Sequence, residues 1–372
     1  MSFPVLSQAE TQDNVTDNVN PPETDSYNST YKQFIYFDDY SLFAPSPFRL
    51  PDVLGAASSE DKFHINAMAR FEYDTNINSS TASGDSEYFY VNAEYSLLKG
   101  KDYDVRVSYT SDQTITNSDS HFDQQSHVGS VTGMYRTDIF KLPVYLFATY
   151  SYGYSFLNNP DYSIISRMNP PFEEIFAAKD FTYEDDFKTQ VVRPSIAVVE
   201  NPNNMTVLQY SFIKEEQKDT ELIFFASGET MTRFFDENLN ASELGLVHYL
   251  SSTDGKYYLY GGFFYSWQTE AIENFMFPGS ENLNSAKYVA GIKVTLPYEL
   301  IMNVDYYQKN TRYEPTGEKV DREVVSARLS KEIAKNFVAF LEYYDRVDEA
   351  ILGFAQENFN RSIYSAGLNY RF

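Results

Sequence analysis

The feature that most restricts how this chain can fold is a two-residue alternation of apolar and polar side chains in segments of about ten residues. From residue 364 to the end, every second side chain is apolar or aromatic: Tyr364, Ala366, Leu368, Tyr370 and Phe372. Because side chains alternate across a β-strand, residues 362–372 predict one strand with an apolar face and a mostly wet face. Their number suits a tilted transmembrane strand, which needs about 9–11 residues.

Alternating segments of this kind follow one another from residue 62 onward, and they predict fourteen strands. No stretch approaches the roughly 18 consecutive apolar residues of a transmembrane helix, so helical membrane spans are excluded. We predict an all-β fold, a single antiparallel transmembrane β-barrel over residues 61–372. The predicted strands are 63–74, 88–97, 103–110, 125–136, 143–155, 187–199, 204–214, 241–251, 257–268, 285–296, 300–310, 320–331, 336–345 and 361–372.

The connections between these segments alternate strictly between short and long. Short periplasmic turns alternating with long extracellular loops, at an even strand count, are typical of outer-membrane barrels. A soluble β-sandwich has no reason to keep that order. The predicted turns are 98–102, 137–142, 200–203, 252–256, 297–299 and 332–335. The predicted loops are 75–86, 111–124, 156–186, 215–240, 269–284, 311–319 and 346–360.

Membrane strands must close into a barrel, because a bilayer offers no water to unpaired backbone groups. The apolar face then looks outward and the polar face inward, whereas a soluble β-protein would bury the apolar face. Charges of both signs stand mid-strand on the polar face, as in a wet, salt-bridged lumen. We therefore predict that these side chains face the lumen: Arg70, Glu72, Glu94, Asp104, Arg106, Arg193, Lys293, Asp305, Arg328, Glu342 and Arg371.

The last strand resembles the closing strand of bacterial outer-membrane β-barrels. In that family the terminal signal is a glycine, an aromatic residue three positions later and a final phenylalanine, here Gly367, Tyr370 and Phe372. The resemblance implies location in the bacterial outer membrane, lipid around the barrel and recognition by the barrel-assembly machinery. Residues 74–78 also resemble a turn seen after an early strand in secretion-linked and polysaccharide-linked barrels, although Asp and Asn favour tight turns anyway.

The N-terminal residues 1–60 form a separate region without long periodic segments. Residues 10–28 are polar and predict a disordered periplasmic tether. Residues 31–50 are too apolar to remain in solvent, and their prolines exclude a regular strand or helix. We expect this stretch to plug the lumen or to dock on a periplasmic or surface partner. The plug candidates are Phe34, Tyr36, Phe37, Phe43 and Phe48.

Composition removes several classes of function. The net charge of −24 disfavours nucleic-acid binding, and it leaves open a cation-preferring lumen or calcium-bridged loops. No cysteine is available for disulfides or thiolate chemistry. The four histidines show no triad or metal-ligand spacing, so we expect neither an enzyme nor a cofactor. They are His64, His121, His127 and His248.

Two of the predicted loops, 156–186 and 215–240, are rich in aromatic residues and acids. Such loops are expected to fold over the pore, either as a gate or by packing on one another. The loop aromatics are Phe172, Phe176, Phe181, Tyr183, Phe224, Phe225, Phe234 and Phe235. We expect a channel for a small solute or an extended polymer, gated by these loops and residues 1–60. The alternative is a closed barrel that anchors or assembles a surface structure.

Overall fold

The structure is a computed structural model. It describes residues 62–77, 82–116, 123–159, 183–201, 203–224, 230–253, 256–272, 279–314, 319–352 and 355–371. Within these residues, no helix is long and apolar enough to cross a membrane. The predicted N-terminal region, with its five plug candidates, lies outside the described residues, as do His121, Phe225 and Phe372.

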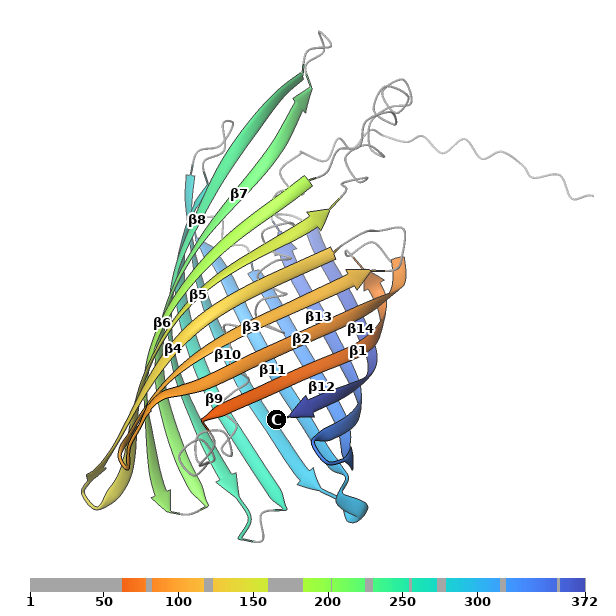
Figure 1. Ribbon diagram of the computed structural model, residues 1–372. Coiled ribbons are helices and arrows are strands. Elements are labelled where there is room, and N and C mark those ends of the chain that lie inside the picture. The colour runs from red at the N-terminus through yellow and green to blue at the C-terminus, as the bar shows by residue number, and fades with distance from the viewer. Residues whose placement is uncertain are drawn as a thin grey trace, which may run out of the picture. The chain divides into compact units, whose positions relative to one another are not determined.

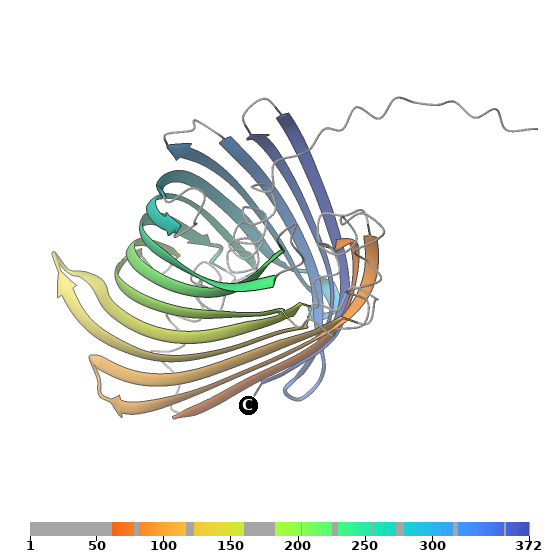
Figure 2. The same ribbon diagram turned by 90° about the horizontal axis from the view of Figure 1, so that it is seen from above.

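The described chain is a closed barrel of fourteen antiparallel strands, in which each strand pairs with its neighbours in sequence (Figures 1 and 2). The predicted fold class and strand count are therefore confirmed. Among the residues that the structure describes, the one helical element is the 3-10 turn η1, Pro297–Glu299. The strands are β1 (Phe63–Ile77), β2 (Ala82–Lys99), β3 (Tyr103–Thr116), β4 (Asp123–Ile139), β5 (Leu142–Asn159), β6 (Tyr183–Asn201), β7 (Asn204–Phe224), β8 (Thr230–Ser251), β9 (Tyr257–Ile272), β10 (Gly279–Thr295), β11 (Ile301–Glu314), β12 (Lys319–Ala334), β13 (Phe337–Leu352) and β14 (Ala355–Arg371).

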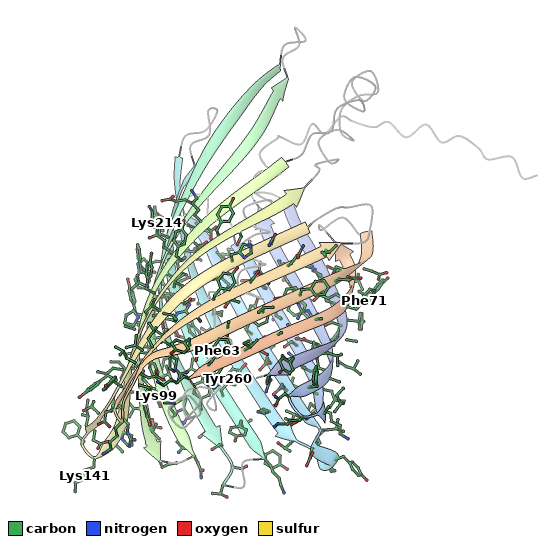
Figure 3. The ribbon with its side chains drawn as sticks, viewed as in Figure 1. Phe63, Phe71, Lys99, Lys141, Lys214 and Tyr260 are labelled. Carbon is green, nitrogen blue, oxygen red and sulfur yellow. The ribbon has the colours of Figure 1, made fainter. Side chains whose placement is uncertain are left out.

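The two faces of the wall have opposite exposure, as β1 shows. Phe71 and Tyr73 are exposed (48% and 43%), whereas the neighbouring Arg70 and Glu72 are buried (7% and 8%). Figure 3 labels Phe71 on the outside of the barrel. The barrel closes where β1 pairs with β14, from Asn66 opposite Arg371 to Asp74 opposite Ile363. Exposed aromatic and aliphatic side chains thus stand outside, and charged ones stand inside. This inverts the arrangement of a soluble β-protein, whose apolar face is buried.

The strands extend beyond their predicted ends on the side opposite the short turns. The largest difference is at 215–240, which we predicted as a loop. β7 and β8 instead stay paired out to Phe224 opposite Thr230, and in Figure 1 this hairpin reaches past the neighbouring strands. That prediction was wrong for Phe224, Phe234 and Phe235, which lie in strands.

Two further predicted connections begin or end differently. The predicted turn at 74–78 is wrong for its first four residues, because β1 runs to Ile77 and Asp74 pairs with Ile363. The predicted loop 156–186 is shortened at both ends by β5 and β6, and Tyr183 starts β6. Phe172, Phe176 and Phe181 lie outside the described residues.

The tight turn between β4 and β5 has an unfavourable sequence for its backbone. Ile139 pairs with Leu142, so the turn consists of Phe140 and Lys141 alone, and Figure 3 shows Lys141 at its tip. Both residues have positive φ, 53° and 68°. Two-residue hairpins with positive φ at both positions prefer Asn-Gly, because other residues clash with their own backbone there. Phe140 is also 95% exposed, so no packing offsets this strain.

We expect replacement of Phe140 by Asn together with Lys141 by Gly to stabilise the barrel. Relief of the left-handed backbone should raise the free energy of unfolding by about 1–2 kcal/mol. The measurement is a denaturant titration in detergent micelles, followed by the fluorescence of the single tryptophan, Trp267. An unchanged or lower midpoint would contradict a strained turn.

Candidate functional site

The candidate site is the inner surface of the barrel, and its chemistry differs between two sides. Charged side chains from β12–β14 and β1–β3 form what we call the charged wall. Aromatic and aliphatic side chains from β5–β9 form what we call the aromatic wall. The charged wall comprises Arg70, Glu72, Asp74, Glu94, Asp104, Arg106, Arg322, Glu342, Arg346, Asp348 and Arg361. The aromatic wall comprises Tyr145, Ala197, Met205, Val207, Val247, Tyr249 and Phe264.

One cluster of deeply buried charges consists of Asp348 and two arginines. Arg322 on β12 donates from Nε to Asp348 Oδ1 at 2.9 Å. Arg346, two residues before Asp348 on β13, donates from Nε to both carboxylate oxygens at 3.0 Å, and its Nη2 also pairs with Oδ2. Arg322, Arg346 and Asp348 are only 4%, 1% and 3% exposed, respectively. A buried carboxylate that accepts from two guanidiniums is strongly held, since removal of one partner leaves charge uncompensated.

The pairs continue along the inner side from strand to strand. Across the β1–β14 seam, Arg361 contacts the Asp74 carboxylate at 2.5 Å. Arg70 lies 2.5 Å from Glu72 and 3.7 Å from Glu342 on β13. On β3, Arg106 bridges Asp104 (2.6 Å) and Glu94 of β2 (2.7 Å). Each guanidinium thus joins carboxylates on its own strand, on a neighbouring strand or, for Arg70 and Glu342, across the intervening strand β14. This half of the interior is polar but close to charge-neutral.

The aromatic wall departs from the predicted polar interior. Its seven residues point inward and are at most 7% exposed. At its edges, Lys287 Nζ lies 4.8 Å from the Phe264 ring centroid and Arg136 lies 5.9 Å from Tyr145. Alternation did not reveal this wall, because strands such as 143–155 are apolar on both faces. Inside a barrel of this size, aromatic surface can line part of the lumen beside polar groups.

Aromatic rings of the inner surface lie across glycines of the adjacent strands. The Phe264 ring on β9 covers Gly245 on β8, and the Tyr260 ring covers Gly291 on β10. Any Cβ at either glycine would overlap the ring. Tyr260 can therefore cross β10 and donate its hydroxyl hydrogen to Asp305 Oδ1 on β11 at 2.6 Å. These ring–glycine contacts and the Tyr260–Asp305 hydrogen bond hold the two rings against the inner surface.

The structure describes all eleven of the charged residues predicted for the lumen. Six of them belong to the charged wall, and Asp305 bonds to Tyr260 as above. Arg193 donates to Ser211 Oγ at 3.0 Å, the Arg328 guanidinium lies 3.7 Å from the Phe340 ring, and Lys293 Nζ lies 5.5 Å from the Tyr258 ring. Arg371 is exposed at the end of β14.

Sequence reasoning missed several inner-surface charges, for two reasons. Arg322 and Lys287 share their strand faces with Arg328 and Lys293, so the alternation contained the signal for both. Arg346, Asp348 and Arg361 were missed because they lie in or beside the segment taken as a loop. Among the residues that the structure describes, no group of three or more histidines and acids is placed to hold a metal ion.

The described histidines occupy different faces. His64 lies on the inner face of β1, like Arg70, whereas His127 and His248 lie on outer faces. His248 Nδ1 is 2.8 Å from Thr206 Oγ1, which donates to Glu200 at 2.5 Å. Sequence spacing gave no sign of this trio, because strand pairing brings it together. The threonine proton points to the carboxylate and not to the imidazole, so the trio lacks the geometry that activates a nucleophile.

No known protein family matches the sequence, and no curated protein matches it. Solved structures do. The chain is similar to the CymD monoaromatic hydrocarbon channel, with a TM-score of 0.51 at 7% identity, over 89% of this chain and 94% of that chain. The outer-membrane expressed OmpT of Vibrio cholerae gives a TM-score of 0.47 at 8% identity, over 84% and 99%. A Pseudomonas aeruginosa FadL homologue gives 0.46 at 8% identity, over 85% and 91%. At such low identity, the likeness to CymD concerns the fold, which is that of an outer-membrane β-barrel.

Proposed function

We propose that this chain is an outer-membrane channel through which a small solute passes along the inner surface of the barrel. The observation that carries the proposal is the inverted wall, with apolar side chains outside and a charged wall facing an aromatic wall inside. Fourteen strands enclose a space that wall side chains need not fill. The likeness to CymD, a monoaromatic hydrocarbon channel, supports a channel fold.

The chemistry of the inner surface favours a solute with both polar and apolar parts. The charged wall places carboxylates and guanidiniums along one side of the inner surface, and the aromatic wall places rings next to lysine and arginine along the other. In the named charged wall, six carboxylates accompany five guanidiniums. We therefore expect this wall to discriminate solutes more by hydrogen bonding than by net charge.

Gating and partners belong to the same proposal. We propose that residues 1–60 restrict the lumen and that the long loops narrow its far mouth. We propose that an extended polymer, if it is the substrate, passes along the same inner surface. In this proposal the barrel-assembly machinery inserts the barrel into the outer membrane, where lipid surrounds the strands. The end with the short turns then faces the periplasm. A periplasmic or surface protein partner remains compatible with this arrangement.

Single-channel conductance in a planar bilayer tests the proposal. The full chain should give steady steps with weak cation preference, because the inner charges are largely paired. A chain starting at residue 61, which keeps every described strand, should conduct more if the N-terminal region restricts the lumen. Equal conductance of the two chains would contradict that gating.

Absence of conductance from both chains would overturn the channel. It would favour the second candidate, a closed barrel that anchors or assembles a surface structure. The specific observation favouring that role is the β7–β8 hairpin. Its pairing continues six residues past the last β6–β7 pair, from Lys218 to Phe224. Such a projecting ribbon offers backbone edges to an extended partner segment.

A further inference from the structure

A polar trio interrupts the apolar outer surface at the short-turn end of β6, β7 and β8. It consists of Glu200, Thr206 and His248, all near strand ends. Thr206 stands directly opposite His248 in the β7–β8 register. Glu200 and His248 are exposed, and Thr206 is half-buried. None of the three faces the inner surface, so they take no part in the proposed channel path.

The hydrogen bonds determine which atoms of the trio are left to meet a ligand. The Thr206 hydroxyl donates its only hydrogen to Glu200 Oε1 at 2.5 Å. Thr206 Oγ1 must therefore accept the 2.8 Å bond from His248, which places a proton on Nδ1. In the neutral imidazole, Nε2 then carries a lone pair. The trio presents two acceptors, His248 Nε2 and the second oxygen of Glu200.

The backbone at Glu200 is irregular in a way that serves this arrangement. Val199 pairs with Met205 and Asn201 pairs with Asn204, so Glu200 is the extra residue of a β-bulge. A bulge re-aims a side chain locally, and bulges are frequent beside functional sites. Here the carboxylate reaches the neighbouring strand and bonds Thr206.

The neighbours of the trio are apolar and outward-facing. On β8, His248 stands between Leu246 and Leu250, which are 50% and 41% exposed. Leu208 on β7 and Leu259 on β9 are each 45% exposed. Glu200 and His248 thus lie at the edge of the apolar outer surface, which lipid covers in the proposed membrane placement. Ionisable groups in contact with lipid are costly, and they mark functional sites when they persist.

We propose that Glu200 and His248 bind the primary ammonium group of a phospholipid headgroup, in the leaflet at the short-turn end. An ammonium has three N–H donors and a positive charge, which suit one carboxylate oxygen and one imidazole lone pair. The leucines around the trio contact the acyl chains. A choline headgroup has no N–H to donate, and a glycerol headgroup has no positive charge. The site therefore selects ethanolamine lipids; it rests on the proposed membrane placement and not on conduction.

Native mass spectrometry of the full chain tests the site. The protein is released from micelles that contain equal amounts of phosphatidylethanolamine and phosphatidylcholine with identical acyl chains. We expect about tenfold preferential retention of the ethanolamine lipid, the effect of one charge-assisted hydrogen bond. The double variant Glu200→Gln and His248→Gln should lose that preference. Phosphatidylglycerol in place of the choline lipid should again be retained less by the unchanged chain.

His127→Gln is the matched control. His127 is another outward histidine, but its Nδ1 bonds the Tyr109 hydroxyl at 2.8 Å instead of a carboxylate-bound threonine. That variant should keep the full preference for ethanolamine. Equal retention of both lipids by the unchanged chain, or an undiminished preference in the double variant, would overturn the site alone. Failure of the chain to insert into vesicles would overturn the membrane placement and the site together.

Discussion

Replacement of Asp348 by Asn is expected to lower the free energy of unfolding by about 3–5 kcal/mol. The carboxylate is 3% exposed and accepts hydrogen bonds from Arg322 and Arg346. The amide has nearly the same shape but no charge, and its nitrogen faces donors. Two buried guanidiniums then lose a shared anion in an interior that solvates them poorly. The measurement is a denaturant titration of the refolded protein, followed by the fluorescence of Trp267.

The exposed pair of Lys214 and Glu216 provides the control for Asp348. Their side chains are 39% and 42% exposed and lie 2.6 Å apart. An ion pair in contact with solvent contributes about 0–1 kcal/mol, so Glu216→Gln should change stability little. A loss for Asp348→Asn no larger than this control would show that burial of the arginine–aspartate cluster adds no net stability.

Much of the barrel was predictable because a membrane imposes one pattern on every strand. Each strand that crosses lipid needs an apolar face, and the alternation therefore locates it. Predicted strand 320–331 lies within β12, and predicted strand 204–214 starts with β7. The short turns were predictable too, because chain reversal interrupts the alternation at once.

The far ends of the strands were not predictable by the same reasoning. Residues 215–221 are Glu-Glu-Gln-Lys-Asp-Thr-Glu, which contain no apolar side chain. A strand that projects beyond the lipid has water on both faces and needs no alternation. Its backbone pairing with β8 continues nonetheless. Periodicity measures the solvent on each face, not the hydrogen bonding of the backbone.

The inner surface was predictable for single charges but not for their partners. Arg70 and Glu72 were identified because they stand mid-strand on the polar face of an alternating segment. The pairing of Arg361 with Asp74 joins residues 287 positions apart, and no local pattern encodes it. The aromatic wall was missed because Tyr145 and Tyr249 stand in strands with apolar residues on both faces. Only the strand pairing of the closed barrel shows which face of these strands points inward.

Gly367→Ala is expected to impair closure of the barrel and to lower the free energy of unfolding by about 1–3 kcal/mol. Gly367 pairs with Arg70 on β1 and with Phe340 on β13. A Cβ there would lie 2.5 Å from the Ala69 carbonyl oxygen and 2.6 Å from Phe340 Cζ. The Arg328 guanidinium lies 3.7 Å from the same Phe340 ring, so the ring has little room to move. The backbone oxygen cannot move without disturbing the seam.

Refolding in detergent separates this packing role from the proposed role of Gly367 in the assembly signal, because no assembly machinery is present there. Gly129→Ala is the control, since a Cβ at Gly129 meets no atom within 4 Å and alanine is the better strand residue. If packing dominates, Gly367→Ala lowers stability in detergent and Gly129→Ala does not. If Gly367→Ala refolds with unchanged stability but fails to reach the membrane in cells, the glycine acts through recognition and the packing argument is wrong.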